Sequence, residues 1–422
     1  MPNETDLPLI HVTGRRWEAT GGGDTVTVKT TAQILRDYRG PALFSFGFRP
    51  FFLFAAIWSA AAVPIWILVL LIGPEWLADA ITREWHIHEM LFGYAGAVIV
   101  GYMTVAGANW TGHFPVAGRP IAGLLALWIA GRAVMLASGV YPALAAVDAA
   151  FLLLFALALW REQLAARNWR SLAPCIVVSL LAIADILVHM RPLDYDFALA
   201  GERMGIALIT FLIAMMGGRL VPSFTRNWMA QRKVKPEPPA YGRFDSFAAG
   251  ACALALLSWV LLPSNVATAA LLLIAGAASL ARLLRWRGWA AWREPLVWIL
   301  HAGYAWAGLG LLLLGLSILL PEQMPITVPI HALTAGAIGV MTLAMMTRTA
   351  RSHTGRAREA DEVTLVLFLL VNAAAAMRVA APLAIDWHLE LLALSAACWS
   401  LAFLLFVLRY GPMLVRPWQR KP

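Results

Sequence analysis

Charged residues are scarce in this chain. Only 14% of its 422 residues are Asp, Glu, Lys or Arg, whereas 60% are hydrophobic. A soluble protein of this size could not cover its surface with so few charges, so the composition predicts a membrane protein that crosses the bilayer many times. The net charge of +9 does not indicate nucleic-acid binding, because the basic residues fall mainly in loops predicted on one side of the membrane.

Cysteine is also rare. Cys175, Cys252 and Cys398 lie far apart within apolar segments and form no CxxC pair. This excludes a disulfide framework and a CxxC metal site, and we interpret the three thiols as packing residues. A cleavable signal peptide is not expected, because the first forty residues are polar and include three consecutive glycines where an apolar core would be needed.

Apolar segments of spanning length recur along the rest of the chain. They predict an all-α polytopic protein with twelve transmembrane helices and both termini in the cytoplasm. We expect a disordered N-terminal tail at 1–43, one membrane domain at 44–410 with a basic, Pro-rich cytoplasmic loop at 222–242, and a cytoplasmic tail at 411–422. The expected spans are 50–73, 86–108, 120–138, 142–160, 172–190, 200–221, 243–263, 265–284, 295–319, 327–350, 361–382 and 388–410.

The basic residues set the expected orientation. With both termini in the cytoplasm, 28 of the 33 Lys and Arg residues fall on the cytoplasmic side. The outer side holds only Arg83, Arg191, Arg203 and Arg378, and Arg132 lies inside the third span. Membrane insertion produces this asymmetry, and an odd number of spans would destroy it.

Two apolar segments that begin with a histidine share a pattern. After both His88 and His331, glycine recurs at +5, +8 and +24, methionine at +15, and threonine at +16 and +23. We interpret the pattern as an internal repeat between the second and tenth spans, which carries a histidine into the membrane twice.

In this topology four histidines lie at a similar depth near the outer face. Neutral imidazole is a common ligand of haem iron and copper. His86 and His88 are two residues apart, so their rings should point roughly 200° apart on a helix and serve two neighbouring sites. We predict that His88 and His331 bind haem, and that His86, with His189 or His301, forms a second haem or copper site. For any single histidine the alternative is a polar anchor at the headgroup level.

Other charges inside the membrane could assist these histidines. Arg132 and Arg378 could neutralise haem propionates near the outer surface. Asp185 stands one helical turn before the fifth-span histidine and could orient its ring or relay a proton. Glu89 and Asp185 are the candidate catalytic residues, because they are the carboxylates nearest the predicted ligands. The alternative is structural, with Arg132 paired to Asp148.

Several motifs resemble the NnrS family. They are FRPFF from Phe48, HIHEMLFGY from His86, GR at Gly218 followed by Phe224-Thr225, and the run from His331 to the HTGR that ends at 356. The resemblance covers about 44–410. It implies a protein of the bacterial inner membrane that contains haem, expected to be b-type, and copper. It also implies a link to denitrification, nitric oxide and nitrosative stress.

A looser resemblance is to the haem-copper oxidases, whose twelve helices form three four-helix arcs with haem ligands on the second and tenth. Here the sixth span, the expected middle copy, has no histidine, and the seventh lacks the adjacent histidines of an oxidase copper centre. The pseudo-threefold arrangement is therefore a hypothesis, and a copper centre of the oxidase type is not expected.

Three classes of function remain open. One is a haem protein that binds or reduces nitric oxide, with quinol as a candidate electron donor. The second is a haem or copper handling protein that protects iron centres without turnover, and the third is a secondary transporter. The ionisable residues gather near the outer face rather than at a polar midplane site, which favours a cofactor site over transport. The expected partners are nitric oxide or a related small molecule, membrane lipid and quinol, and no nucleic acid.

Overall fold

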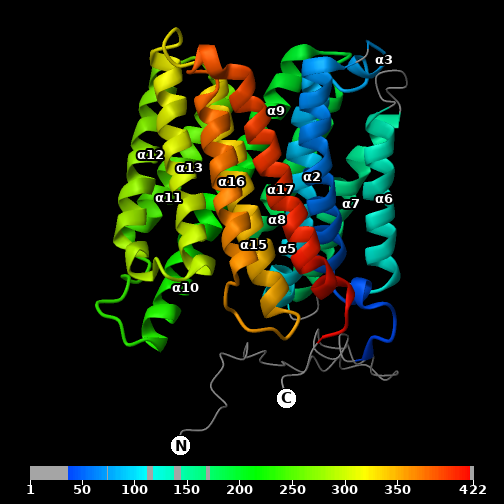
Figure 1. Cartoon of the computed structure of the whole chain (residues 1–422), viewed down its shortest axis with the longest axis vertical. Helices are drawn as coiled ribbons and strands as arrows, with labels where there is room; N and C mark the ends of the chain where they lie inside the picture. The colour runs from blue at the N-terminus through cyan, green and yellow to red at the C-terminus, as the bar shows by residue number, and fades with distance from the viewer. Residues whose placement is uncertain (1–36, 74, 112–116, 137–143, 168–171, 419–422) are drawn as a thin grey trace, which may run out of the picture.

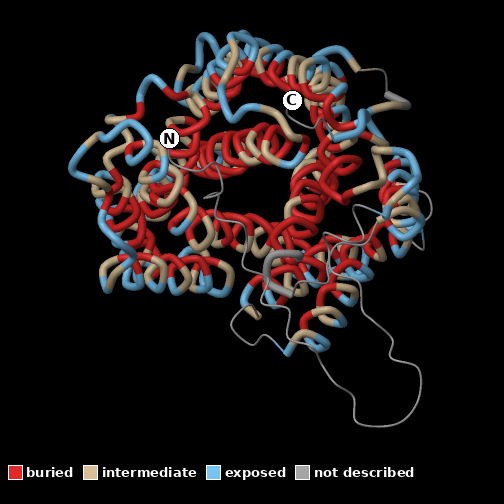
Figure 2. Tube along the Cα trace, turned by 90° about the horizontal axis from the view of Figure 1, so that it is seen from below, coloured by how far each residue is buried: buried red, intermediate tan, exposed pale blue. Residues whose placement is uncertain are grey.

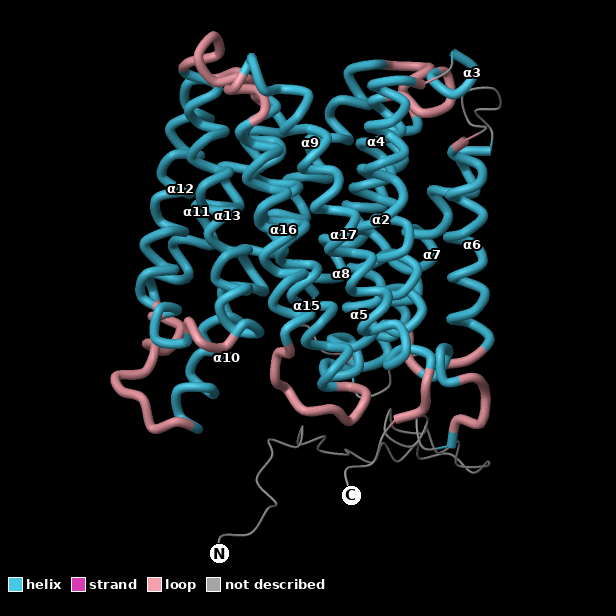
Figure 3. The backbone as a smooth tube through the Cα atoms, viewed as in Figure 1, coloured by secondary structure: helices cyan, strands magenta, loops and turns pink. Residues whose placement is uncertain are grey.

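The computed structural model describes residues 37–418, except 74, 112–116, 137–143 and 168–171. Figure 3 shows that the described residues form helices joined by loops at the two ends of a bundle, without a strand among them. The predicted tail at 1–43 lies mostly outside the described residues. In chain order the described elements are η1 (Ala42–Ser45), α2 (Phe48–Ile72), α3 (Glu75–Ala78), α4 (Arg83–His88), η2 (Glu89–Ala95), α5 (Gly96–Thr111), α6 (Arg119–Met135), α7 (Ala145–Ala166), α8 (Leu172–His189), α9 (Tyr195–Leu212), η5 (Ile213–Gly217), α10 (Gly218–Gln231), α11 (Arg243–Leu261), α12 (Val266–Arg285), η6 (Gly288–Ala291), α13 (Pro295–Leu319), α14 (Thr327–His331), η7 (Ala332–Gly339), α15 (Val340–Ser352), α16 (Glu362–Ala380), η8 (Ile385–Trp387) and α17 (His388–Val415). The elements labelled α are α-helices. Of those labelled η, η1, η6 and η8 are short 3-10 helices and η2, η5 and η7 are π-helices.

Ten helical stretches of the described chain are long and apolar enough to cross a membrane. They correspond to ten of the twelve expected spans and confirm a multi-pass, all-helical membrane protein. The other two expected spans are α6 and α7, which run beside the rest in Figure 1. Helix α6 has 17 residues, and α7 carries Asp148, Arg161 and Glu162. The full count of twelve therefore stays a prediction.

The two segments that carry the paired histidines are the most enclosed in the bundle. In their most apolar windows, 89% of the α4–η2–α5 segment and 72% of the α14–η7–α15 segment are buried, against 28–61% for the other eight. Viewed along the bundle, buried residues line the inner faces of the helices and exposed residues the outside (Figure 2). The histidine-bearing helices are therefore central, where protein rather than lipid surrounds their polar side chains.

Both of these segments widen into a π-helix directly after the histidine. Segment η2 begins at Glu89 and η7 begins at Ala332. Such π-helical turns are rare and occur often at functional sites. Both π-helices begin one residue after the histidine, in agreement with the internal repeat expected from the sequence. The repeat itself stays a hypothesis. A third π-helix, η5, lies between α9 and α10.

The first and last long helices meet at one end of the molecule. Arg49 Nη1, near the start of α2, donates to the backbone carbonyls of Leu414 (3.0 Å) and Arg416 (2.7 Å) at the end of α17. The loops from α10 to α11 and from α15 to α16 lie at this same end, the lower one in Figure 1. This common end is the one predicted to be cytoplasmic, and its sidedness stays a prediction.

Candidate functional site

The end of the bundle opposite the start of α2 contains a cavity of about 830 Å³ between α4, α9, α14 and α16. Its wall is largely apolar and aromatic, and a small number of imidazole and guanidinium groups interrupt it. This composition is typical of sites that bind small organic ligands and cofactors. The charged, histidine and aromatic lining residues are Arg83, His86, Glu202, Arg203, His331, Arg378, His388, Trp66, Tyr94, Trp259 and Trp399.

His331 is held in one tautomer by the helix that carries it. Its Nδ1 lies 2.7 Å from the backbone carbonyl oxygen of Thr327, one turn earlier in α14. A carbonyl oxygen can only accept, so Nδ1 carries the proton and Nε2 keeps its lone pair. Histidines that bind metals are commonly oriented in this way by a backbone carbonyl.

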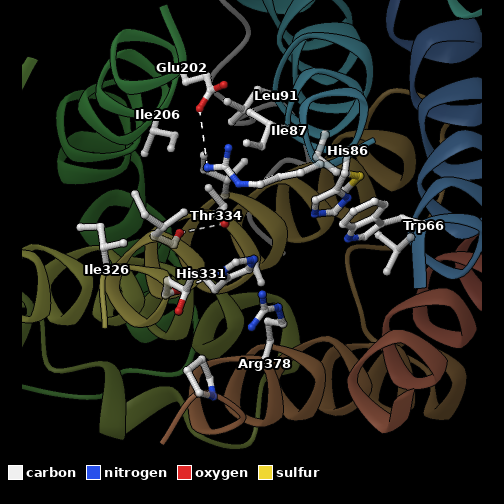
Figure 4. A pocket seen from close by; sticks show the side chains of 18 of the residues that line it. Trp66, His86, Ile87, Leu91, Glu202, Ile206, Ile326, His331, Thr334 and Arg378 are labelled. Atoms are coloured by element: carbon white, nitrogen blue, oxygen red, sulfur yellow. Dashed lines mark hydrogen bonds and ion pairs between the residues drawn. The ribbon is translucent and has the colours of Figure 1, made fainter. Parts of the chain in front are cut away.

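His86 occupies another part of the cavity wall. Its ring stacks on Trp66 of α2, with ring centroids 5.5 Å apart and an interplanar angle of 13°. Figure 4 shows this stacked pair on one side of the cavity, and His331 and Arg378 pointing toward each other on another. The buried Nδ1 of His86 has no hydrogen-bond partner among the described residues. An orphaned buried nitrogen is costly unless a ligand or water satisfies it.

Positive charge exceeds negative charge around the cavity. Arg83, Arg203 and Arg378 line it, and buried guanidinium nitrogens of Arg203 and Arg378 lack a partner in the described structure. The lining carboxylate, Glu202, forms an ion pair with Arg191 and lies 4.0 Å from Arg83. The site therefore favours a ligand that carries negative groups.

A second polar group lies outside the cavity lining, between α4, α7 and α8. We call His88, Asp148, Asp185 and His189 the His88 cluster. His88 Nε2 lies 2.9 Å from Asp148 Oδ2 and 3.0 Å from Asp185 Oδ1. His189 Nε2 lies 3.1 Å from the same Asp148 oxygen and 3.7 Å from the same Asp185 oxygen. Two imidazole nitrogens and two carboxylate oxygens thus converge within 4.8 Å of one another.

Neighbouring side chains fix the cluster from the other side. Arg132 of α6 forms an ion pair with the remaining oxygen of Asp148 and another, at 3.1 Å, with Glu89 Oε2. Trp58 Nε1 donates to the same Glu89 oxygen at 2.6 Å. Glu89 directly follows His88 as the first residue of the π-helix η2, and it is buried inside the bundle. The Arg132–Asp148 pair that the sequence suggested is confirmed.

The structure divides the predicted histidines into different groups. His86 and His331 share the cavity, whereas His88 lies with His189 in the His88 cluster rather than opposite His331. The expected divergence of the His86 and His88 rings is confirmed. His301 lies elsewhere, on α13, with its Nε2 2.8 Å from Thr225 Oγ1.

The remaining predicted residues also separate. Asp185 belongs to the His88 cluster and Glu89 lies beside it. Neither of them lines the cavity, whereas Arg378 does. The sequence reasoning missed Asp148 as a partner of His88. It also missed the cavity-lining role of Arg83 and Arg203, although acidic and basic residues inside apolar segments are a signal for such sites.

Comparison with known proteins places the chain in a family. No curated protein matches it. The model of the NnrS family, described as NnrS protein, matches residues 42–418. This match covers nearly the whole chain, including both the cavity and the His88 cluster. The chain belongs to the NnrS protein family.

Proposed function

We propose that this protein binds a b-type haem in the cavity between His86 and His331, and that it binds nitric oxide there at the outer side of the bacterial inner membrane. The observation that carries the proposal is the joint presence of three imidazoles, those of His86 and His331 among them, and three arginines around one cavity of about 830 Å³. This volume lies within the roughly 300–1,000 Å³ typical of cofactor sites. Membership of the NnrS family supports a role in the response to nitrosative stress.

The lining residues fit a haem by their chemistry. Imidazole nitrogen is the commonest protein ligand of haem iron, and His331 presents an unprotonated Nε2 because its Nδ1 is bound to Thr327. Arg203 and Arg378 offer buried donors without partners, which suits the two propionates. When bound, the haem supplies an iron atom that coordinates nitric oxide.

His331 and His86 take different roles in this proposal. The backbone hydrogen bond fixes the His331 ring, so His331 is the residue that would bind the haem iron. The His86 ring is fixed by stacking on Trp66, and its Nδ1 has no partner among the described groups. His86 would therefore be a second residue that holds the haem.

Binding is favoured over reduction of nitric oxide. Reduction consumes protons, and proton delivery needs a titratable group within reach of the reacting atoms. Glu89 and Asp185 do not line the cavity, and the lining carboxylate Glu202 is already bound to Arg191. Nitric oxide is a small apolar gas and could enter from the lipid without a polar channel. Copper, which the family resemblance also implies, would need ligands other than His86 and His331.

An absorption spectrum of the detergent-purified, haem-replete protein tests the proposal. We expect a Soret band that shifts on dithionite reduction and shifts again when nitric oxide is added without oxygen. A Soret band that ignores nitric oxide would leave haem binding intact and refute the gas-binding role. A protein without any Soret band after haem-replete expression would refute both and return the transporter hypothesis to first place.

A further inference from the structure

We propose that His88, Asp148, Asp185 and His189 bind one divalent transition-metal ion, at a site separate from the cavity. None of the four residues lines the cavity, so this inference does not depend on the haem proposal. Three of them are almost completely buried, with 1–3% of the side chain exposed, and His189 is 12% exposed. The site is therefore shielded from water on nearly all sides.

Four of the six distances between the donor atoms are close to those around a four-coordinate ion, and all six are within 4.8 Å. Metal–nitrogen and metal–oxygen bonds of about 2.0–2.1 Å in a tetrahedron place neighbouring donors about 3.3 Å apart. In the His88 cluster the imidazole nitrogens lie 2.9, 3.0, 3.1 and 3.7 Å from the carboxylate oxygens. The donors already stand at ligand spacing and all point toward one another.

The charges of the region also call for a cation. Glu89, Asp148 and Asp185 contribute three negative charges, and Arg132 contributes one positive charge, so the group carries a net charge of −2 when both histidines are neutral. An uncompensated buried charge is very unfavourable in a low-dielectric interior. One divalent ion would neutralise the group.

Protons are the competing way to neutralise it. Two protons placed on His88 and His189 would make two imidazolium ions whose ring centroids are only 4.9 Å apart. Two like charges at that distance inside a protein repel each other strongly. In addition, both rings direct Nε2 to the same Asp148 oxygen, which suits one shared ion better than two separate hydrogen bonds.

The surrounding groups have the arrangement that orients metal ligands. Glu89 Oε1 lies 3.4 Å from the other ring nitrogen of His88, and a carboxylate in that position stabilises the metal-binding tautomer. Arg132 holds one oxygen of Asp148 and leaves the second for the ion. The donors include no sulfur, which disfavours Cu⁺, whereas imidazole with carboxylate suits Zn²⁺ or Cu²⁺.

Metal analysis of the full-length, detergent-purified protein tests this proposal. The protein is loaded with Zn²⁺ alone or Cu²⁺ alone, passed over a chelating resin, and assayed by mass spectrometry. We expect about one equivalent of metal in the wild type, less than a tenth of that in Asp185→Asn and His189→Ala, and affinity about 10–100-fold lower in Glu89→Gln. His331→Ala and His301→Gln are the matched controls and should retain the metal.

Two further measurements distinguish the loss of the metal site from the loss of the folded structure. Electron paramagnetic resonance of the Cu²⁺-loaded wild type should show coupling to two nitrogens, and His189→Ala supplied with excess Cu²⁺ should show one. A monodisperse elution profile reports folding in every variant, and the Soret band reports it in the variants that keep His86 and His331. A wild type that retains neither Zn²⁺ nor Cu²⁺, or variants that retain as much as the wild type, would overturn the proposal and leave the cluster as a hydrogen-bonded ion network.

Discussion

At the scale of single residues, Arg132 compensates two buried carboxylates at once. It pairs with Asp148 and with Glu89, and only 6% of its side chain is exposed. Replacing it with methionine keeps the length of the side chain and removes the charge. Breaking a buried pair in this way leaves uncompensated charge, so Arg132→Met should lower the free energy of unfolding by about 3–5 kcal/mol.

Thermal unfolding in detergent measures that effect, and Arg161 provides a control. Arg161 also pairs with a carboxylate, Glu162, but 75% of its side chain is exposed. Arg161→Met should therefore change stability by about 1 kcal/mol or less. Equal effects of the two substitutions would contradict the buried network around the His88 cluster.

Arg132 packs closely against the backbone at Gly93. A methyl group at Gly93 would overlap Arg132 Nη1 and lie 2.7 Å from Glu89 Oε2. Gly93→Ala should therefore displace the Arg132–Glu89 pair and lower the unfolding temperature. At Gly123 of α6 nothing lies within 4 Å of the added carbon, so Gly123→Ala should be neutral or stabilising by about 0.5–1 kcal/mol. A harmless Gly93→Ala would show that this close approach is absent.

At the scale of helices, one carboxylate ties three of them together. Asp361 caps α16 by accepting from the backbone N–H of Thr364 at 2.9 Å. Its other oxygen accepts from Arg351 of α15 and Arg409 of α17, both at 2.7 Å. Asp361→Ala should lose the cap and both ion pairs, at a cost of about 1–2 kcal/mol. Asp194→Ala should cost less, because in the described structure the Asp194 side chain is seen to accept hydrogen bonds from its own helix, at the backbone N–H groups of Asp196 and Phe197.

Low pH should lower the stability of the protein through the same carboxylate, that of Asp361. Burial alone would raise the pKa of Asp361, but hydrogen bonds from Thr364 and Arg409 and the charge of Arg351 lower the pKa to about 2. The stability that Asp361 contributes is therefore complete above its ordinary pKa of 3.8 and is lost as the pH falls toward 2. Thermal unfolding between pH 5 and 3 should show a smaller loss in Asp361→Asn than in the wild type. Parallel profiles would count against this linkage.

The existence of the helices could be predicted from composition, but their interruptions could not. Long apolar runs define spans, since the bilayer requires about twenty apolar residues per helix. The helical period also predicted that His86 and His88 diverge. The π-helices after His88 and His331 leave no mark in the apolar pattern, because they add one residue per turn within an apolar run.

Which histidines contact one another depends on how the helices pack, and the spacing of residues along the chain does not determine that packing. The ring centroid of His88 on α4 lies 4.9 Å from the ring centroid of His189 on α8, whereas the repeat suggested His331 as its partner. Arg132 and Asp148 were easier to pair, because they lie at facing ends of two consecutive helices. Contacts between neighbours in sequence were predictable, and contacts between distant helices were not.

At the scale of the whole molecule, the described structure places its loops in two groups. The loops at 232–242 and 353–361 lie at the end where Arg49 meets the end of α17, and those at 262–265, 320–326 and 381–384 lie at the other. The positive-inside rule assigns the first group to the cytoplasm. Reporter fusions at 238 and after 418 should report cytoplasm, and fusions at 264 and 323 should report the outside. Fusions at 238 and 264 that report the same side would contradict this arrangement.

The central claim is that the cavity histidines hold the haem, and the haem content of matched variants tests it most directly. His331→Ala should lose most of the Soret absorbance per protein, and His86→Ala should keep haem with an altered spectrum and an altered response to nitric oxide. His301→Ala is the control, because His301 does not line the cavity and its Nε2 lies 2.8 Å from Thr225 Oγ1. Wild-type haem content and an unchanged spectrum in both His331→Ala and His86→Ala would contradict the account.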